Sequence, residues 1–258
     1  MNPIHQVPSE YLRRAAATPA IRAIKQRAYA LMGLLPGASA LDIGCGPGIG
    51  TTELARIVGP FGQVWGVDRD AAMVREAEQA AQAAGVAAWT AHRVADATAL
   101  PFADATFHAC CSDRLLQHVP PDAARRCIAE AARVLRPGGA MVMVDSDWGS
   151  FSADCADAEL ERRMQALHRR RFLNPFSGRT LGRIMTEAGL GFVGVEPFAV
   201  PLTGAQAANL LAPTAREAER AGTLDEAEAE AWRAAMAAWP AAAVVAHLTI
   251  VLAAGVRQ

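Results

Sequence analysis

The sequence predicts an α/β protein built on a doubly wound, mainly parallel sheet. Short apolar runs alternate with segments of helical periodicity along most of the chain, which is the pattern of strands joined by crossover helices. A glycine-rich turn links the first apolar run directly to a helical segment. The chain has 258 residues, of which 52% are hydrophobic, so it can bury one large core.

The expected elements follow one another in a regular order. A helix is expected at 19–34, where Ile21, Ile24, Ala28 and Leu31 form an apolar stripe. Strands are expected at 39–44, 62–67, 87–94, 106–112, 140–146, 190–200 and 243–254, and helices at 50–58, 70–84, 121–135, 156–171 and 179–188. The order of these elements favours seven strands with helices on both faces of the sheet.

We expect residues 1–258 to form a single domain. Within it, residues 1–36 supply N-terminal helices, and residues 147–188 supply a helical cap or insertion. Residues 203–240 are rich in alanine and glutamate at helical spacing, so they are interpreted as an inserted pair of helices.

The turn after the first strand is built to approach a ligand closely. It places glycines at alternate positions, and residues without a side chain let backbone amides come against a bound molecule. The turn also lies at the carboxyl edge of the predicted sheet, where open α/β folds hold nucleotides. A dinucleotide fingerprint fails, because Ile49 or Thr51 occupies its last position, and a P-loop fails because no lysine follows.

The pattern Asp42-x-Gly44-x-Gly46-x-Gly48 resembles the first motif of class I S-adenosylmethionine-dependent methyltransferases. Asp68 ends the next strand, 24 residues after Gly44, where a carboxylate can accept hydrogen bonds from ribose hydroxyls.

Two later segments extend the resemblance. Asp96-Ala97 resembles the family's adenine-binding region, and residues 132–139 resemble the helix end and turn before its fifth strand. The similarity covers roughly residues 20 to 200. It is nearest to the small-molecule enzymes related to ubiquinone and menaquinone biosynthesis.

This resemblance implies a Rossmann-like fold with an antiparallel last strand and S-adenosylmethionine as the cofactor. The expected reaction is transfer of a methyl group to O, N or C of a small molecule by in-line displacement, in which positioning alone can supply about 7–11 kcal/mol. The residues expected to bind the cofactor are Asp42, Gly44, Cys45, Gly46, Gly48, Asp68, Arg69, Asp96, Ala97 and Ser112.

Candidates for the acceptor side follow the fourth and fifth strands. His118 and Asp147 are the candidate catalytic residues, since an imidazole or a carboxylate can take a proton or hold a donor group. Arg114, Trp148 and Arg179 are the candidate substrate-binding residues. The alternatives are that His118 only orients its turn and that Trp148 is a packing anchor. The remaining arginines between 162 and 171 are expected to form a solvated helix face.

Composition excludes several other functions. The net charge is -1, from 25 basic and 26 acidic side chains, so no positive field favours nucleic acid. The cysteines and histidines lack metal-ligand spacing, so no metal site is expected. The longest apolar run, 241–256, is too short for a membrane span and no secretory signal is evident, so the protein is expected in the cytoplasm. The oligomeric state stays open, with a homodimer as one option.

Two other classes of function remain. The chain could bind S-adenosylmethionine without transferring its methyl group, either as a regulatory subunit or as a lyase or cyclase that uses the sulfonium charge. A nicotinamide oxidoreductase is weakened by Ile49 and Thr51. The acceptor is not determined by the sequence; a quinone-type compound or a secondary metabolite is what the resemblance implies.

Overall fold

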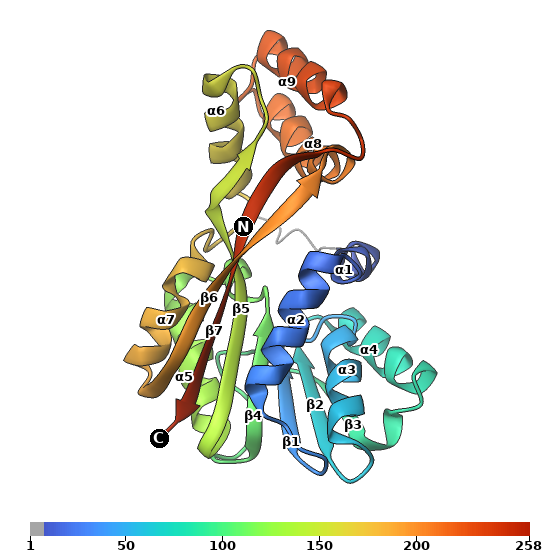
Figure 1. Ribbon diagram of the computed structural model, residues 1–258, viewed down its shortest axis with the longest axis vertical. Coiled ribbons are helices and arrows are strands. Elements are labelled where there is room, and N and C mark those ends of the chain that lie inside the picture. Colours follow the sequence, from blue (N-terminus) through green and yellow to red (C-terminus); the bar gives the residue numbers. More distant parts are fainter. Residues whose placement is uncertain (1–7) are drawn as a thin grey trace.

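A computed structural model describes residues 8–258 and contains one seven-stranded sheet of order β3-β2-β1-β4-β5-β7-β6 (Figure 1). The strands are β1 (Ser39–Ile43), β2 (Gln63–Asp68), β3 (Thr90–Val94), β4 (Phe107–Asp113), β5 (Leu135–Ala153), β6 (Leu190–Thr203) and β7 (Val244–Arg257). β1 to β5 pair in parallel, and β7 runs antiparallel to both of its neighbours. The expected mainly parallel sheet with an antiparallel last strand is confirmed.

Helices cover both faces of the sheet because side chains alternate along the strands. Ala40 of β1 belongs to the core cluster beneath α2 (Pro19–Met32), α3 (Ile49–Val58) and the C-terminal part of α4 (Ala71–Ala83). Leu41, one residue later, belongs to the opposite cluster.

That second cluster lies beneath α5 (Pro121–Val134) and α7 (Ser177–Glu187), which cover the other face of the sheet. The two-residue period of a strand therefore divides the core into two layers.

Three strands extend beyond the rest of the sheet. β5, β6 and β7 continue upward in Figure 1 and carry a second helical group of α6 (Ala158–Arg169), α8 (Gly204–Arg220) and α9 (Glu226–Ala238). Both α8 and α9 begin with a capping box, in which the N-cap side chain and the third helical residue exchange hydrogen bonds with the backbone. Trp232 of α9 is among the largest fully buried side chains, and it belongs to the same core cluster as Ala40 of β1, so this group continues one face of the core.

The expectation that the fifth strand ends at residue 146 is wrong. β5 continues to Ala153, and the first residues of the segment expected to be a helical cap are strand. Asp147 pairs with Thr249, and Ala153 pairs with Ala246 of β7. The conformation of this segment is decided by pairing with β7, about a hundred residues further along the chain. The local pattern of apolar residues cannot predict such a distant partner.

Smaller boundary differences appear elsewhere. Residues 87–89 form a 3₁₀ turn before β3, and α7 begins two residues earlier than expected. An additional helix, α1 (Ser9–Ala16), lies within the segment expected to form N-terminal helices. Residues 1–7 of that segment lie outside the described residues. Within residues 8–258, no helix is both long enough and apolar enough to cross a bilayer.

Candidate active site

The glycine turn between β1 and α3 is fixed by the strand beside it. The amides of Gly44 and Cys45 both donate to the carbonyl of Val67, at 2.8 and 2.9 Å. Gly44 has a φ of 74°, and a Cβ there would come within 3.0 Å of the Leu115 side chain. The turn is therefore held between β2 and the segment that follows β4, with its backbone at the carboxyl edge of the sheet.

Asp68 closes this turn from the end of β2. Its Oδ2 accepts a hydrogen bond from the amide of Gly46 at 2.9 Å, and its Oδ1 accepts one from the amide of Asp70 at the same distance. Each carboxylate oxygen can accept a second bond. Asp68 can therefore support the turn and still receive two hydroxyl groups from a ligand.

Asp42 and Cys45 lie at the buried base of the turn. The hydroxyl of Thr51 donates to Oδ2 of Asp42 at 3.0 Å, and burial raises the pKa of this carboxyl to about 6. Burial likewise raises the pKa of the Cys45 thiol. A Cβ at Gly50 would lie only 2.7 Å from Oδ2 of Asp42, so this carboxyl contacts the first turn of α3 from below.

The other two turn glycines are packed against helices. A Cβ at Gly46 would lie 3.6 Å from Cδ1 of Leu12 in α1, and one at Gly48 would lie 2.8 Å from Ala77 in α4. Arg13 of α1 also pairs with Glu76 of α4 at 2.9 Å. The first helix therefore lies across the glycine turn.

The end of β4 carries an unsatisfied hydroxyl group. Ser112 is 4% exposed, and its Oγ has no hydrogen-bond partner among the described residues. Leaving a buried hydroxyl without a partner costs about 1–3 kcal/mol, which a ligand group would recover. Together, this hydroxyl, the glycine turn and Asp68 fit a nucleoside-bearing cofactor.

Arg114 follows with a left-handed backbone, at a φ of 58°. Its guanidinium forms two hydrogen bonds to Asp113, from Nε at 2.8 Å and from Nη2 at 3.2 Å. Burial alone would raise the pKa of Asp113, but the Arg114 charge holds it below its ordinary value. A non-glycine residue in this conformation stores strain, and such strain clusters at functional sites.

Arg69 lies within electrostatic range of two other predicted residues, Asp96 and His118, which come from separate segments of the chain. Asp96 accepts hydrogen bonds from the amide and the hydroxyl of Thr98, both at 2.8 Å, and these bonds hold its pKa below the ordinary value. The charge of Arg69 acts on both Asp96 and His118. Ala97, next to Asp96, is half-buried. The ends of β2, β3 and β4 therefore converge, as parallel strands require.

His118 ends a 3₁₀ turn at Leu116–His118 and is half-buried. Burial, together with the charges of Arg69 and Arg114, lowers its pKa to about 4. Its Nε2 lies 3.1 Å from Nε2 of Gln117. The imidazole is therefore neutral at neutral pH, and it is a weak base.

Trp148 forms a wall beside His118. Its Nε1 donates to Oε1 of Gln117 at 2.7 Å, and its ring stacks on Phe172 with centroids 4.4 Å apart. Phe172 in turn lies 5.9 Å from the His118 ring. Gln117 was not singled out in the sequence, where a lone glutamine carries no signal, yet it links Trp148 to the His118 turn.

Asp147 and Arg179 form an ion pair. Nε of Arg179 donates to Oδ2 of Asp147 at 2.9 Å, and Nη2 lies 2.9 Å from Oδ1. Asp147 is 8% exposed, whereas half of the Arg179 side chain is exposed and lies over Phe176. Two residues expected to have different roles are thus one charge-neutral unit.

Asp145 is a site residue that the sequence interpretation missed. It is 1% exposed and accepts three hydrogen bonds, from the Leu116 amide at 2.6 Å, the Ser146 amide at 2.8 Å and the Ser177 hydroxyl at 2.8 Å. These bonds join β5 to the His118 turn and to α7. Because Leu116 and Ser177 are distant from Asp145 in the sequence, only the tertiary structure reveals its role.

Changing Asp145 to Asn should flatten the pH dependence of stability. Burial raises the pKa of Asp145 to about 7 from an ordinary 3.8, so its stabilising contribution is complete below about pH 4 and is lost as the pH rises through 7. The shift corresponds to at most about 4 kcal/mol. Urea unfolding at pH 5 and pH 8 measures the effect. The free energy of unfolding of D145N, relative to that of the wild type, should increase from pH 5 to pH 8.

A second variant separates this effect from a general loss of packing. The Ser177 hydroxyl lowers the Asp145 pKa, so Ser177→Ala should keep the pH dependence and move it to higher pH. If the free energy of unfolding changes equally with pH in the wild type and in D145N, Asp145 does not titrate in this range.

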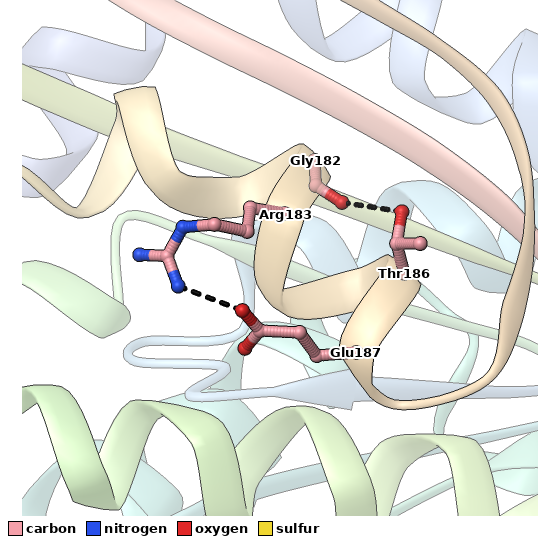
Figure 2. Close-up of a pocket in the computed structure, with 4 residues that line it drawn as sticks. All are labelled: Gly182, Arg183, Thr186 and Glu187. Carbon is pink, nitrogen blue, oxygen red and sulfur yellow. Dashed lines mark hydrogen bonds and ion pairs between the residues drawn. The ribbon is translucent and has the colours of Figure 1, made fainter.

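A separate hollow of about 520 Å³ lies on α7 and is lined by Gly182, Arg183, Thr186 and Glu187 (Figure 2). Arg183 pairs with Glu187 at 2.8 Å, and the Thr186 hydroxyl donates to the Gly182 carbonyl. Its polar groups are used within one helix, so it is not a candidate for the chemistry. Nowhere in residues 8–258 do three or more His, Cys, Asp or Glu side chains gather in a way that could hold a metal ion.

The fold and this edge define a nucleoside-cofactor enzyme of the α/β class, and comparison with known proteins identifies the family. A family model described as a methyltransferase domain matches residues 40–139. An uncharacterized 37.1 kDa protein in transposon TN4556 of Streptomyces fradiae is 35% identical over 251 residues, covering 95% of this chain and 71% of that protein. The chain belongs to the class I S-adenosylmethionine-dependent methyltransferases.

More distant relatives have names that describe a reaction. The ubiquinone/menaquinone biosynthesis C-methyltransferase of Saccharophagus degradans is 37% identical over 121 residues, covering 47% of this chain and 48% of that enzyme. The chain thus spans about half the length of this relative. A crystal structure of geranyl diphosphate C-methyltransferase from Streptomyces coelicolor A3(2), with S-adenosyl-L-homocysteine, has a TM-score of 0.58 at 19% identity. It covers 92% of this chain and 80% of its own, and it shows the shared fold alone.

Proposed function

We propose that this chain transfers a methyl group from S-adenosylmethionine to O, N or C of a small-molecule acceptor. The observation that carries the proposal is the glycine turn, which is closed by the Asp68 carboxylate and lies close to the unpartnered Ser112 hydroxyl. When bound, the cofactor supplies a methyl group on a positively charged sulfur. Family membership supports this choice of cofactor.

The cofactor side of the site is assigned by the chemistry of each group. Asp68 would hold the ribose hydroxyls and Asp96 the adenine amino group, since both are carboxylates at strand ends. The Gly44–Gly48 backbone would face the amino-acid part, and Arg69 would flank the adenosine. Asp42 and Cys45 are buried, so they would support the backbone of the turn without contacting the cofactor.

The acceptor side is assigned to the wall formed by Trp148, Phe172 and His118. A stacked aromatic pair beside a neutral imidazole suits a flat, weakly polar guest, and a quinone-type acceptor is consistent with the named relative. A base is most effective when its pKa is near the working pH, and the pKa of His118 is about 4. His118 would therefore orient the acceptor through a hydrogen bond, and positioning would supply most of the catalysis.

We assign the remaining predicted residues to positions around this wall. Arg114, paired with Asp113, would border both ligands, and the Asp147–Arg179 pair would present one exposed guanidinium face to a polar group of the acceptor. We further propose that α6, α8 and α9 form a cap over the acceptor within one domain. The cytoplasmic location and the homodimeric option remain predictions from the sequence.

Product formation tests the proposal directly. The protein is incubated with methyl-labelled S-adenosylmethionine and a panel of quinols, phenols and amines, and release of S-adenosylhomocysteine is measured together with label in the acceptor. We expect turnover with at least one acceptor of the aromatic type. Calorimetry with S-adenosylmethionine and with NAD, run in parallel, checks the choice of cofactor.

Each alternative has its own result. Tight binding of S-adenosylmethionine without release of S-adenosylhomocysteine on any acceptor would favour a binding protein, or a lyase or cyclase that uses the sulfonium charge. Binding of NAD in preference to S-adenosylmethionine would overturn the assignment of the cofactor site.

A further inference from the structure

A second hollow lies at the amino edge of the sheet, the length of β1 away from the glycine turn. It has a volume of about 390 Å³, and its lining includes Ser39 at the start of β1, Trp89 before β3, His108 in β4 and Arg136 in β5. Phe61, in the turn before β2, stands at its rim and is 91% exposed. No Asp or Glu lines this hollow within the part of the chain that the structure describes.

The backbone of Ser39 fixes the protonation state of His108. The Ser39 amide donates to Nδ1 of His108 at 2.9 Å, and an amide N–H can only donate. The Ser39 hydroxyl lies 2.9 Å from the same Nδ1 and 3.2 Å from the Thr106 carbonyl, and it can donate to either acceptor. A neutral imidazole has one N–H, so when Nδ1 accepts, the proton is on Nε2. Burial and the neighbouring Arg136 lower the pKa of His108, which favours this neutral ring.

The proton on Nε2 faces another donor. Nη1 of Arg136 lies 2.7 Å from Nε2 of His108, and a guanidinium has no acceptor. Among the described residues, no carboxylate forms an ion pair with Arg136, and none lines the hollow, so no acceptor lies between the two donors. Two donors are thus directed at the same small space, and an oxygen acceptor placed there would receive both protons. The conflict is specific to this pair, because it depends on the Ser39 amide that fixes the tautomer.

We propose that His108 and Arg136 bind an oxyanion at the mouth of this hollow, as the phosphate or carboxylate group of a small molecule. A guanidinium binds such groups through two parallel hydrogen bonds, and the Nε2 proton supplies a third. Phe61 and Trp89 give the hollow an apolar wall for the rest of the ligand. The site is separate from the glycine turn and does not depend on the proposed methyl transfer.

Histidine side-chain NMR tests the site in the whole protein. Inorganic phosphate and acetate are titrated separately, and the ring nitrogens of His108 are followed. We expect Nε2 to carry the proton before titration, and we expect a saturable shift of its resonance with at least one of the two anions. The anion that binds more tightly identifies the kind of ligand group.

Variants connect the shift to the named side chains. Arg136→Gln should weaken anion binding at least tenfold, and Arg136→Lys should keep part of it, because a single ammonium replaces the fork. Arg93→Ala removes an exposed arginine of β3 that does not line the hollow, and it should leave the affinity unchanged. Calorimetry should give the same S-adenosylmethionine affinity for all three variants as for the wild type.

Two results would overturn the proposal. One is a shift of the His108 resonance that grows linearly with both anions and saturates with neither. The other is an equal saturable shift in Arg136→Gln, because the anion would then be bound elsewhere.

Discussion

Replacing Gly48 by alanine should destabilise the protein by about 2–5 kcal/mol and abolish cofactor binding. Gly48 has a φ of 78°, a left-handed conformation that costs other residues about 1–2 kcal/mol. A Cβ at this position would lie 2.8 Å from both Cα and Cβ of Ala77 in α4, and overpacking of this kind costs about 1–3 kcal/mol more. To make room, α3 must move away from α4, and the glycine turn moves with it.

Gly33 provides the matched control for this variant. It ends α2 in the same left-handed conformation, with a φ of 58° and a ψ of 26°, and a Cβ there would meet nothing within 4 Å. Gly33→Ala should therefore cost only the backbone term, about 1–2 kcal/mol, and leave cofactor affinity unchanged. Urea unfolding and calorimetry of both variants give the comparison. An equal loss in the free energy of unfolding for the two variants would show that the contact of Gly48 with α4 does not exclude a side chain from the turn.

The sequence predicts the glycine turn well because its determinants are local. Alternate glycines between a short strand and a helix define the conformation, and Asp68 follows at the spacing of one crossover helix. The structure adds the reason for two of these positions, since Leu115 leaves no room for a side chain at Gly44 and Ala77 leaves none at Gly48. Parallel pairing of β1 with β2 and with β4 then brings these segments to one edge.

The proposed acceptor side is less evident from the sequence, because its residues interact with partners that are distant along the chain. Asp147 and Arg179 were both singled out, but they are 32 residues apart and nothing in the sequence marks them as a pair. Gln117, which links Trp148 to the His118 turn, and Asp145, which holds that turn against α7, carry no motif. Their roles depend on hydrogen bonds across elements, and a pattern of residue types along the chain does not record such bonds.

The extension of β5 beyond residue 146 also depends on a partner that is distant in the sequence. The bulge between Asp147 and Ser152 places Trp148 beside the His118 turn, and the Ser150 hydroxyl accepts the Thr249 amide within the irregular part of the ladder. A bulge redirects side chains without ending a strand. The segment 147–153 was expected to start the helical cap because its partner strand, β7, is far away in the sequence.

Replacing Asp68 by alanine should lower the affinity for S-adenosylmethionine at least 100-fold. The carboxylate accepts two backbone hydrogen bonds that shape the turn, and in the proposed complex it accepts two more from the ribose. Hydrogen bonds to a charged group are worth about 1.5–3 kcal/mol each, so losing two of them corresponds to about 100-fold or more in affinity. Asp68→Asn keeps one carbonyl oxygen and should fall between the wild type and the alanine variant.

The matched comparison is Asp96→Ala, at the end of the next strand. Asp96 is exposed and accepts hydrogen bonds from the amide and hydroxyl of Thr98. Its loss removes at most one contact to the adenine and should lower the affinity only several-fold. Calorimetry with S-adenosylmethionine and S-adenosylhomocysteine measures both variants, and urea unfolding shows whether they are folded. A folded Asp68→Ala that binds as tightly as the wild type would remove Asp68 from the ribose site. Asp68 also anchors the turn through Gly46. A loss of affinity for both ligands in a variant whose free energy of unfolding falls by only about 1–3 kcal/mol would therefore separate the ligand contacts of Asp68 from its structural ones.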